Sequence, residues 1–198
     1  IALAPASVQE MADFVGLAFD LAFKYRNPAI ILADGVIGQM MEKVVLPEQR
    51  PRLTNEEVMA RCPWATFGKL KHRGPNIVTS LELDPAEMEK RNIHLQQKYA
   101  EIEEKEVRYE EIHCDDAEYL IVAFGSCARI AQKAMEEARA EGIKVGLLRP
   151  ITLWPFPSKA IAERSRQVKG ILTVELNAGQ MVEDVRLAVE CKVPVEYF

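Results

Sequence analysis

The feature that most constrains the fold is a regular alternation of short apolar runs and amphipathic stretches in the second half of the chain. Each run has the length and branched composition of a buried strand, and the stretches between runs repeat apolar residues at helical spacing. The expected strands are residues 119–124, 143–148, 171–175 and 193–198, and the expected helices are residues 126–139, 158–166 and 181–190. This alternation predicts an α/β fold with a doubly wound, mostly parallel sheet.

A second apolar region opens the sequence. Residues 11–23 are predicted to form a largely buried helix, because Ser7 and Glu10 have the spacing of a capping box at its start. A short strand is expected at residues 29–33, and Asp34-Gly35 is predicted to end it with a turn. Residues 36–44 are expected to form a short helix.

The middle of the chain is predicted to connect two folded parts. Residues 47–77 have no clear period and are interrupted by prolines, which indicates a crossing loop. A long helix is expected to begin at Asp84-Pro85. Residues 82–118 hold 13 acidic and 5 basic residues. This composition predicts a solvated linker between domains, with a surface helix inside one domain as the alternative.

Charge and cysteine content exclude several classes of protein. A formal net charge of -5 provides no basic face for nucleic acid. No apolar run is long enough to span a membrane, and no charged-then-apolar leader opens the sequence, so a cytoplasmic location is expected. The 4 cysteines are too scattered for a zinc site or an iron–sulfur cluster, so reduced and mostly buried thiols are expected.

No familiar cofactor or catalytic motif is complete. Ala33 stands where the G-D-G motif of thiamine diphosphate enzymes has its first glycine, and no dinucleotide, P-loop or G-x-S-x-G motif occurs. Gly125-Ser126 places a turn at a helix N-terminus, where free N–H groups can hold an anion, although many α/β turns share this pattern. The sequence therefore identifies no catalytic residue, no metal ligand and no cofactor-binding residue.

Four residues near strand ends are candidates for a structural or interface role. Arg149 and Glu175 each end a strand, and parallel strands place their carboxyl ends on one side of a sheet. We therefore expect Arg149 to contact Glu175 or a nearby backbone carbonyl as a clamp, with a partner subunit or an anionic cofactor group as the alternative. Trp154 and Phe156, each followed by a proline, are expected at a domain or subunit edge.

The same region carries a family resemblance. The run from Arg149 to Pro155 fits an R-x-x-T-L-x-P pattern, and Val174-Glu175 ends the next strand, which resembles the transketolase C-terminal-type domain. A wider set of motifs covers nearly the whole chain: Tyr25–Pro28, Leu32–Glu42, Arg149–Pro157 and Asn177–Arg186. In this order they resemble the alpha-type subunit of 2-oxoacid:ferredoxin oxidoreductases, nearest to the 2-ketoisovalerate and 2-oxoglutarate members.

The resemblance implies a reaction and its partners. The complex would oxidatively decarboxylate a 2-oxo acid to acyl-CoA, with coenzyme A as acceptor of the acyl group and ferredoxin as acceptor of the electrons. Thiamine diphosphate and Mg²⁺ would lie between this subunit and a beta subunit that carries the diphosphate-binding domain. Iron–sulfur clusters would belong to other subunits or domains, and no cofactor is expected on this chain alone.

The resemblance also implies a division into domains. Residues 1–46 would be the end of a pyrimidine-binding-type domain, residues 47–117 the crossing loop and acidic linker helix, and residues 118–198 a transketolase C-terminal-like domain. Both ends of the sequence look interrupted, so we expect an inactive fragment whose catalytic and substrate contacts lie upstream of Ile1 or on other chains. Two alternatives stay open: the C-terminal part of another thiamine diphosphate enzyme (transketolase, deoxyxylulose-phosphate synthase or 2-oxoacid dehydrogenase beta type) and a non-catalytic subunit-interaction module.

Overall fold

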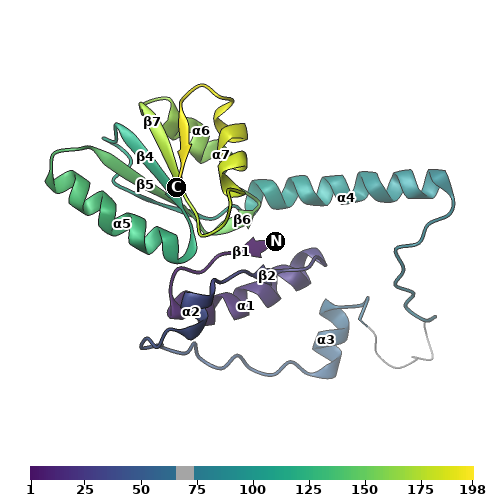
Figure 1. The fold of residues 1–198 in the computed structure, drawn as a ribbon. Coiled ribbons are helices and arrows are strands. Elements are labelled where there is room, and N and C mark those ends of the chain that lie inside the picture. The colour runs from purple at the N-terminus through teal and green to yellow at the C-terminus, as the bar shows by residue number, and fades with distance from the viewer. Residues whose placement is uncertain (66–73) are drawn as a thin grey trace. The chain divides into compact units, whose positions relative to one another are not determined.

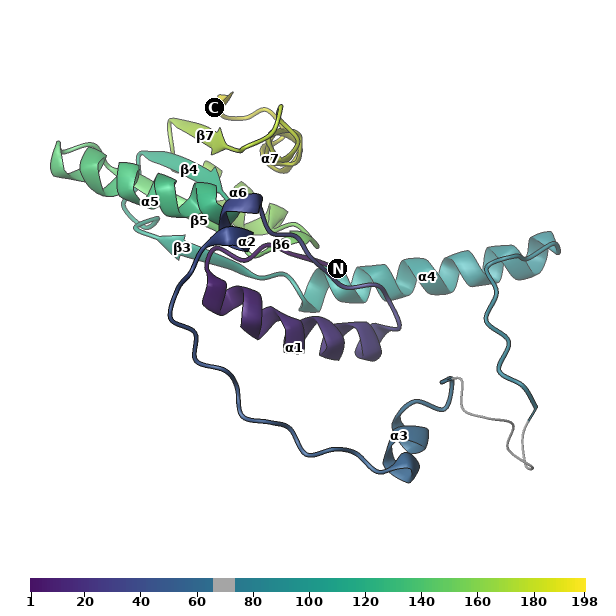
Figure 2. The ribbon, with the colours of Figure 1, turned by 60° about the horizontal axis from the view of Figure 1, so that its bottom comes forward.

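The fold comes from a computed structural model that describes residues 1–65 and 74–198. The chain divides into two compact units, drawn in Figures 1 and 2. Residues 1–46 and 101–198 form the larger unit, and residues 47–100 form the smaller one. The three-domain division expected from the sequence stays a prediction.

The larger unit is built around a five-stranded sheet (Figure 1). In spatial order its strands are β3 (Tyr109–Ile112), β5 (Val145–Pro150), β4 (Tyr119–Ala123), β7 (Gly170–Val174) and β8 (Val195–Tyr197). Four of them run parallel, while β3 lies antiparallel to β5 at one edge. The predicted α/β class is confirmed, and the antiparallel edge strand is an addition to it.

Helices cover both faces of this sheet. Successive residues of β4 point to opposite faces, as the alternation of side chains along a strand requires. Leu120 and Val122 belong to the core beneath α6 (Ser158–Ser165) and α7 (Met181–Val189). Ile121 and Ala123 belong to the core beneath α5 (Gly125–Ala140). Burial on both faces explains why the strand sequences are nearly continuous apolar runs.

A second, three-stranded sheet ties the start of the chain to the segment that follows β5. Its order is β2 (Ile30–Ile31), β1 (Ala2–Leu3) and β6 (Thr152–Trp154). β1 is parallel to β2 and antiparallel to β6. The N-terminal segment therefore shares backbone hydrogen bonds with the chain just beyond Arg149.

Side-chain caps start the two N-terminal helices. α1 (Val8–Tyr25) begins where Ser7 Oγ accepts the N–H of Glu10 at 3.1 Å, as the capping pattern predicts. The Glu10 carboxylate, however, accepts the N–H of Ala6 at 2.8 Å. α2 (Gly35–Gln39) begins at Asp34, whose Oδ1 accepts the N–H groups of Val36 and Ile37. The short helix expected after Asp34 is therefore present, but it begins at Gly35 and ends at Gln39.

The smaller unit contains α3 (Asn55–Arg61) and the first part of α4 (Pro85–Lys105). Thr54 and Glu57 form a complete capping box at the start of α3, so the predicted crossing loop contains a helix. The Asp84 carboxylate accepts two N–H groups at the start of α4. Nowhere along the described ranges is a helix both long and apolar enough to cross a membrane.

Candidate functional site

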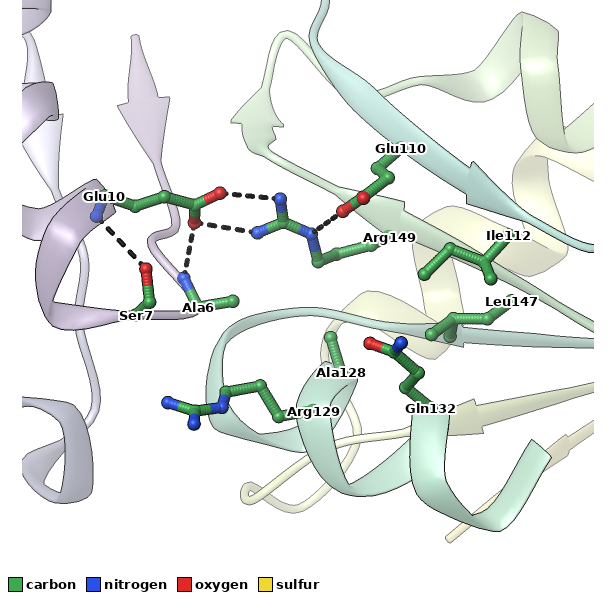
Figure 3. A pocket seen from close by; sticks show the side chains of 10 residues that line it. All are labelled: Ala6, Ser7, Glu10, Glu110, Ile112, Ala128, Arg129, Gln132, Leu147 and Arg149. Atoms are coloured by element: carbon green, nitrogen blue, oxygen red, sulfur yellow. Dashed lines mark hydrogen bonds and ion pairs between the residues drawn. The ribbon is translucent and has the colours of Figure 1, made fainter. Parts of the chain in front are cut away.

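Arg149, near the end of β5, lies at the centre of an ion cluster (Figure 3). Its Nη1 and Nη2 donate to the two carboxylate oxygens of Glu10 at 2.9 and 2.8 Å, and its Nε donates to Glu110 at 2.9 Å. Glu110 stands directly opposite Arg149 in the β3–β5 pairing, and Glu10 lies in the first turn of α1. One guanidinium group therefore joins the first helix to two strands of the large sheet.

Hydrogen bonds and opposite charges outweigh burial in setting the pKa values of Glu10 and Arg149. The Arg149 side chain is 9% exposed, against 27% for Glu10 and 49% for Glu110. Burial raises the pKa of Glu10, but hydrogen bonds from Arg149 and from the Ala6 N–H outweigh it and leave the pKa below its ordinary value. Burial lowers the pKa of Arg149, but Glu10 and Glu110 more than compensate and raise it. Glu10 and Arg149 are therefore held charged at neutral pH, which suits a structural contact better than proton transfer.

A pocket of about 200 Å³ lies beside this cluster. Glu10, Glu110 and Arg149 line one side of it, and Gln132 and Arg129 of α5 line the other (Figure 3). Its lining contains neither histidine nor cysteine, and its one hydroxyl, that of Ser7, caps α1. This lining therefore offers no thiol, and no hydroxyl paired with a histidine, as a nucleophile.

Three further carboxylates hold the N-terminal segment in place. Together with Glu10 they form what we call the carboxylate junction: Glu10, Asp34, Glu42 and Glu106. Asp34 Oδ2 accepts the N–H of Ser126 at 3.0 Å, at the start of α5. Glu42 accepts Arg129 of α5 at 2.8 Å and the N–H of Val8 at 3.0 Å. Glu106, which is buried, accepts the Tyr25 hydroxyl at 2.7 Å and Lys24 at 2.6 Å.

The Asp34 carboxylate occupies the anion position that the sequence allowed for at the Gly125-Ser126 turn. Its carboxylate lies at the N-terminus of α5, beside Gly125, and also caps α2. Burial raises the pKa of Asp34, but hydrogen bonds from the backbone of Ile37 and from Ser126 outweigh it, and the pKa falls below its usual value. The N–H of Ser126 at the start of α5 is thus satisfied from within the chain.

The described residues do not fit a diphosphate and Mg²⁺ site. The carboxylate oxygens of Asp34 already accept hydrogen bonds from the N–H groups of Val36, Ile37 and Ser126. Within the described ranges, no three His, Cys, Asp or Glu residues lie together in a way that could hold a metal ion. All 4 cysteines are free thiols, with Cys114 and Cys127 buried, Cys62 half-buried and Cys191 exposed.

The predicted pairing of Arg149 with Glu175 is wrong. β4 lies between β5 and β7 in the sheet, so the two strand ends are about 10 Å apart. Glu175 instead caps α7: its two oxygens accept the N–H groups of Met181 and Val182, each at 2.9 Å. Asn177 donates to the same carboxylate at 2.9 Å. Arg149 binds Glu10 and Glu110 instead, and its role as a structural clamp stays a prediction.

Trp154 and Phe156 are half-buried and line a second pocket. Trp154 ends β6, and Phe156 precedes α6 and packs against the core beneath it. Their assignment to a domain or subunit edge stays a prediction.

Local sequence patterns do not indicate most contacts of the carboxylate junction or the ion pair between Arg149 and Glu110. Glu10 was assigned only to a helix cap, and Glu110 only to an acidic linker. No local pattern identifies Glu110, because the stretch Tyr109–Ile112 reads Tyr-Glu-Glu-Ile and does not alternate. Nothing local in the sequence pairs Glu42 with Arg129, because 87 residues separate them.

Comparisons with known proteins give the family. Residues 1–113 match the thiamine diphosphate-binding family of pyruvate flavodoxin/ferredoxin oxidoreductases, and residues 117–198 match core domain II of pyruvate:ferredoxin oxidoreductase. The ketoisovalerate oxidoreductase subunit VorB of Methanothermobacter thermautotrophicus is 50% identical over 190 residues, covering 96% of this chain and 52% of the relative. The 2-oxoglutarate synthase subunit KorA of Methanothermobacter marburgensis is 32% identical over 206 residues, covering 94% of this chain and 55% of the relative.

A solved structure supports the fold. The 2-oxoglutarate:ferredoxin oxidoreductase from Magnetococcus marinus aligns with a TM-score of 0.74 at 21% identity, covering 100% of this chain and 39% of that one. The chain spans about half the length of the curated relatives it matches. The likeness of residues 118–198 to a transketolase C-terminal-type domain stays a prediction. The family matches establish that this chain belongs to the pyruvate flavodoxin/ferredoxin oxidoreductase family.

Proposed function

We propose that this chain is part of the alpha-type subunit of an enzyme that oxidatively decarboxylates a 2-oxo acid to acyl-CoA, with ferredoxin as the electron acceptor. The observation that carries the proposal is the 50% identity to the ketoisovalerate oxidoreductase subunit, which extends over 96% of the chain. A second relative with the same description, from Methanothermobacter marburgensis, is also 50% identical, over 97% of the chain.

The preferred substrate in this proposal is a branched-chain 2-oxo acid such as 2-ketoisovalerate. The ketoisovalerate oxidoreductase subunits are 50% identical to this chain, whereas the 2-oxoglutarate synthase subunits reach 31 or 32%. 2-Oxoglutarate is the second candidate, supported by those relatives and by the fold of the Magnetococcus marinus enzyme.

The part of the subunit described by the structure has a supporting role in this proposal. Thiamine diphosphate and Mg²⁺ would be held with a beta subunit, and iron–sulfur clusters would lie on other subunits or domains. Within residues 1–198, the carboxylate junction would fix the N-terminal segment against the large sheet. That arrangement would position the remainder of the thiamine diphosphate-binding domain, because Arg149, Arg129 and the start of α5 all anchor N-terminal carboxylates.

The test is an assay of the natural protein that contains this sequence, purified with its partner subunits. We expect coenzyme A-dependent reduction of ferredoxin with 2-ketoisovalerate, and a lower kcat/KM with 2-oxoglutarate. A preference for 2-oxoglutarate would replace the first substrate by the second. Lack of ferredoxin reduction with any 2-oxo acid would instead favour another thiamine diphosphate enzyme or a non-catalytic module.

A further inference from the structure

A groove of about 480 Å³ lies beside the end of α4 in the larger unit. Aromatic side chains form its wall: Tyr109 of β3, Trp154 of β6 and Phe156 before α6. Pro157 and Ala160, both buried, belong to the rigid start of α6. We call this surface the aromatic groove.

The aromatic groove exposes apolar area from three aromatic side chains. Tyr109 is 43% exposed although it lies on a strand of the large sheet, and Trp154 and Phe156 are half-buried. Aromatic side chains held on rigid backbone lose little conformational freedom on binding, and they are enriched at the centres of protein interfaces. A small-molecule site would instead enclose its ligand among convergent polar groups, whereas the groove is bordered by the exposed residues Ser158 and Lys159.

The charges around the aromatic groove are mainly acidic. Glu103 and Glu104, both exposed, line it from the last turn of α4. Carboxylates are unfavourable at a helix C-terminus, because the negative end of the helix dipole repels them. The neighbouring Lys105 forms its ion pair with Glu101 at 2.8 Å, and interacts more weakly with Glu104. Helix stability therefore does not account for these two carboxylates, and they leave a negative rim beside the aromatic wall.

We propose that the aromatic groove docks a segment of a partner subunit in which an apolar side chain is flanked by lysine or arginine. The apolar side chain would pack against Tyr109, Trp154 and Phe156, and the basic residues would face Glu103 and Glu104. The acidic rim disfavours nucleic acid and anionic membranes as occupants. The inference rests on the proposed function to the extent that this chain works within a complex of several subunits.

The test uses the natural protein that contains this sequence and its separately purified partner subunits. Tyr109→Ser removes an exposed aromatic side chain, and we expect it to raise the Kd of assembly about tenfold or more. The double variant Glu103→Lys/Glu104→Lys is expected to raise Kd at low salt, with a smaller effect at high salt. Matched controls are Leu187→Ser, which alters an apolar side chain that is 76% exposed on α7, and Glu137→Lys on α5. Both controls should leave Kd unchanged.

Each remaining outcome decides the proposal. Unchanged Kd for both groove variants would overturn it, as would a change in self-association in place of partner binding, which would assign the groove to a second copy of this chain. If Tyr109→Ser lowers the thermal midpoint, the Kd of the Glu103→Lys/Glu104→Lys variant alone tests the proposal. A wild-type complex that assembles but does not reduce ferredoxin would refute the proposed function and leave this inference standing. An active complex that tolerates all variants would refute the inference alone.

Discussion

Arg149 and Glu10 are 139 residues apart in the sequence and meet through two hydrogen bonds of 2.9 and 2.8 Å. This bidentate pairing uses the planar fork of arginine, which lysine does not have. It joins the first helix to the large sheet at a point where the guanidinium is nearly excluded from water. Substitutions of Arg149 or Glu10 therefore test how much this contact contributes to holding the N-terminal segment.

We expect Arg149→Ala to lower the free energy of unfolding by about 2 kcal/mol, below the cost of breaking a fully buried pair because both glutamates keep some solvent contact. Arg149→Lys should recover only part of this loss. Urea denaturation of the four species of an Arg149/Glu10 double-mutant cycle measures the coupling. A cycle on Arg149 and Glu175 is the control and should show none; coupling confined to that second pair would restore the pairing that the sequence suggested.

The pKa of Glu10 gives a pH dependence with a definite sign. The pKa is lowered in the folded chain relative to its usual value of 4.5, so the folded state favours the carboxylate. The associated stability is present above the unfolded pKa and is lost as pH falls through the folded pKa. We expect Glu10→Gln to lower the thermal midpoint at pH 7, and the difference from wild type to shrink in acid. A difference that stays constant down to acidic pH would contradict this.

The parts of the fold that follow from local patterns could be predicted from the sequence. The parallel strands, the Ser7 cap and the apolar faces of α5 and α7 each depend on residues close together in the chain. The order of the strands in the sheet does not follow from residues close together in the chain. Arg149 and Glu175 both end parallel strands, but β4 separates them, and the antiparallel β3 brings Glu110 opposite Arg149 instead. The aromatic groove likewise depends on β3, β6 and the end of α4 meeting in space.

Gly146 is predicted to tolerate no side chain. A Cβ at this position in β5 would lie 2.9 Å from the carbonyl oxygen of His113 and 3.0 Å from Cys114 Cα, both backbone atoms. We expect Gly146→Ala to destabilise the chain by about 1–3 kcal/mol, the usual cost of overpacking. Gly38→Ala in α2 is the control, because a Cβ there meets nothing within 4 Å and alanine favours a helix. Equal midpoints for the two variants in urea would refute the close approach.

The cysteines are predicted to differ sharply in reactivity. Burial, with a smaller contribution from Glu111, raises the pKa of the Cys114 thiol to about 11. Because the thiolate is the reactive form, Cys114 should resist alkylation in the folded chain, whereas the exposed Cys191 should react quickly. Mass spectrometry after a short iodoacetamide pulse distinguishes the two sites, and denaturation should make their labelling equal. Comparable labelling in the folded chain would show that Cys114 is accessible.

The last prediction concerns Glu175, because its carboxylate caps α7 although the residue lies outside that helix. Its two oxygens accept the N–H groups of Met181 and Val182, and Asn177 holds it in place. The residue is buried, so these bonds replace water around groups at the positive end of α7. We expect Glu175→Ala to lower the free energy of unfolding by about 1–2 kcal/mol.

Glu175→Gln keeps an acceptor oxygen but not the charge, and its free energy of unfolding should fall less. Glu183→Ala, in the same first turn of α7, is the control and should have little effect. Hydrogen exchange at the amides of Met181 and Val182 reports the cap directly: both should exchange faster in Glu175→Ala, and protection equal to wild type would remove Glu175 from this role.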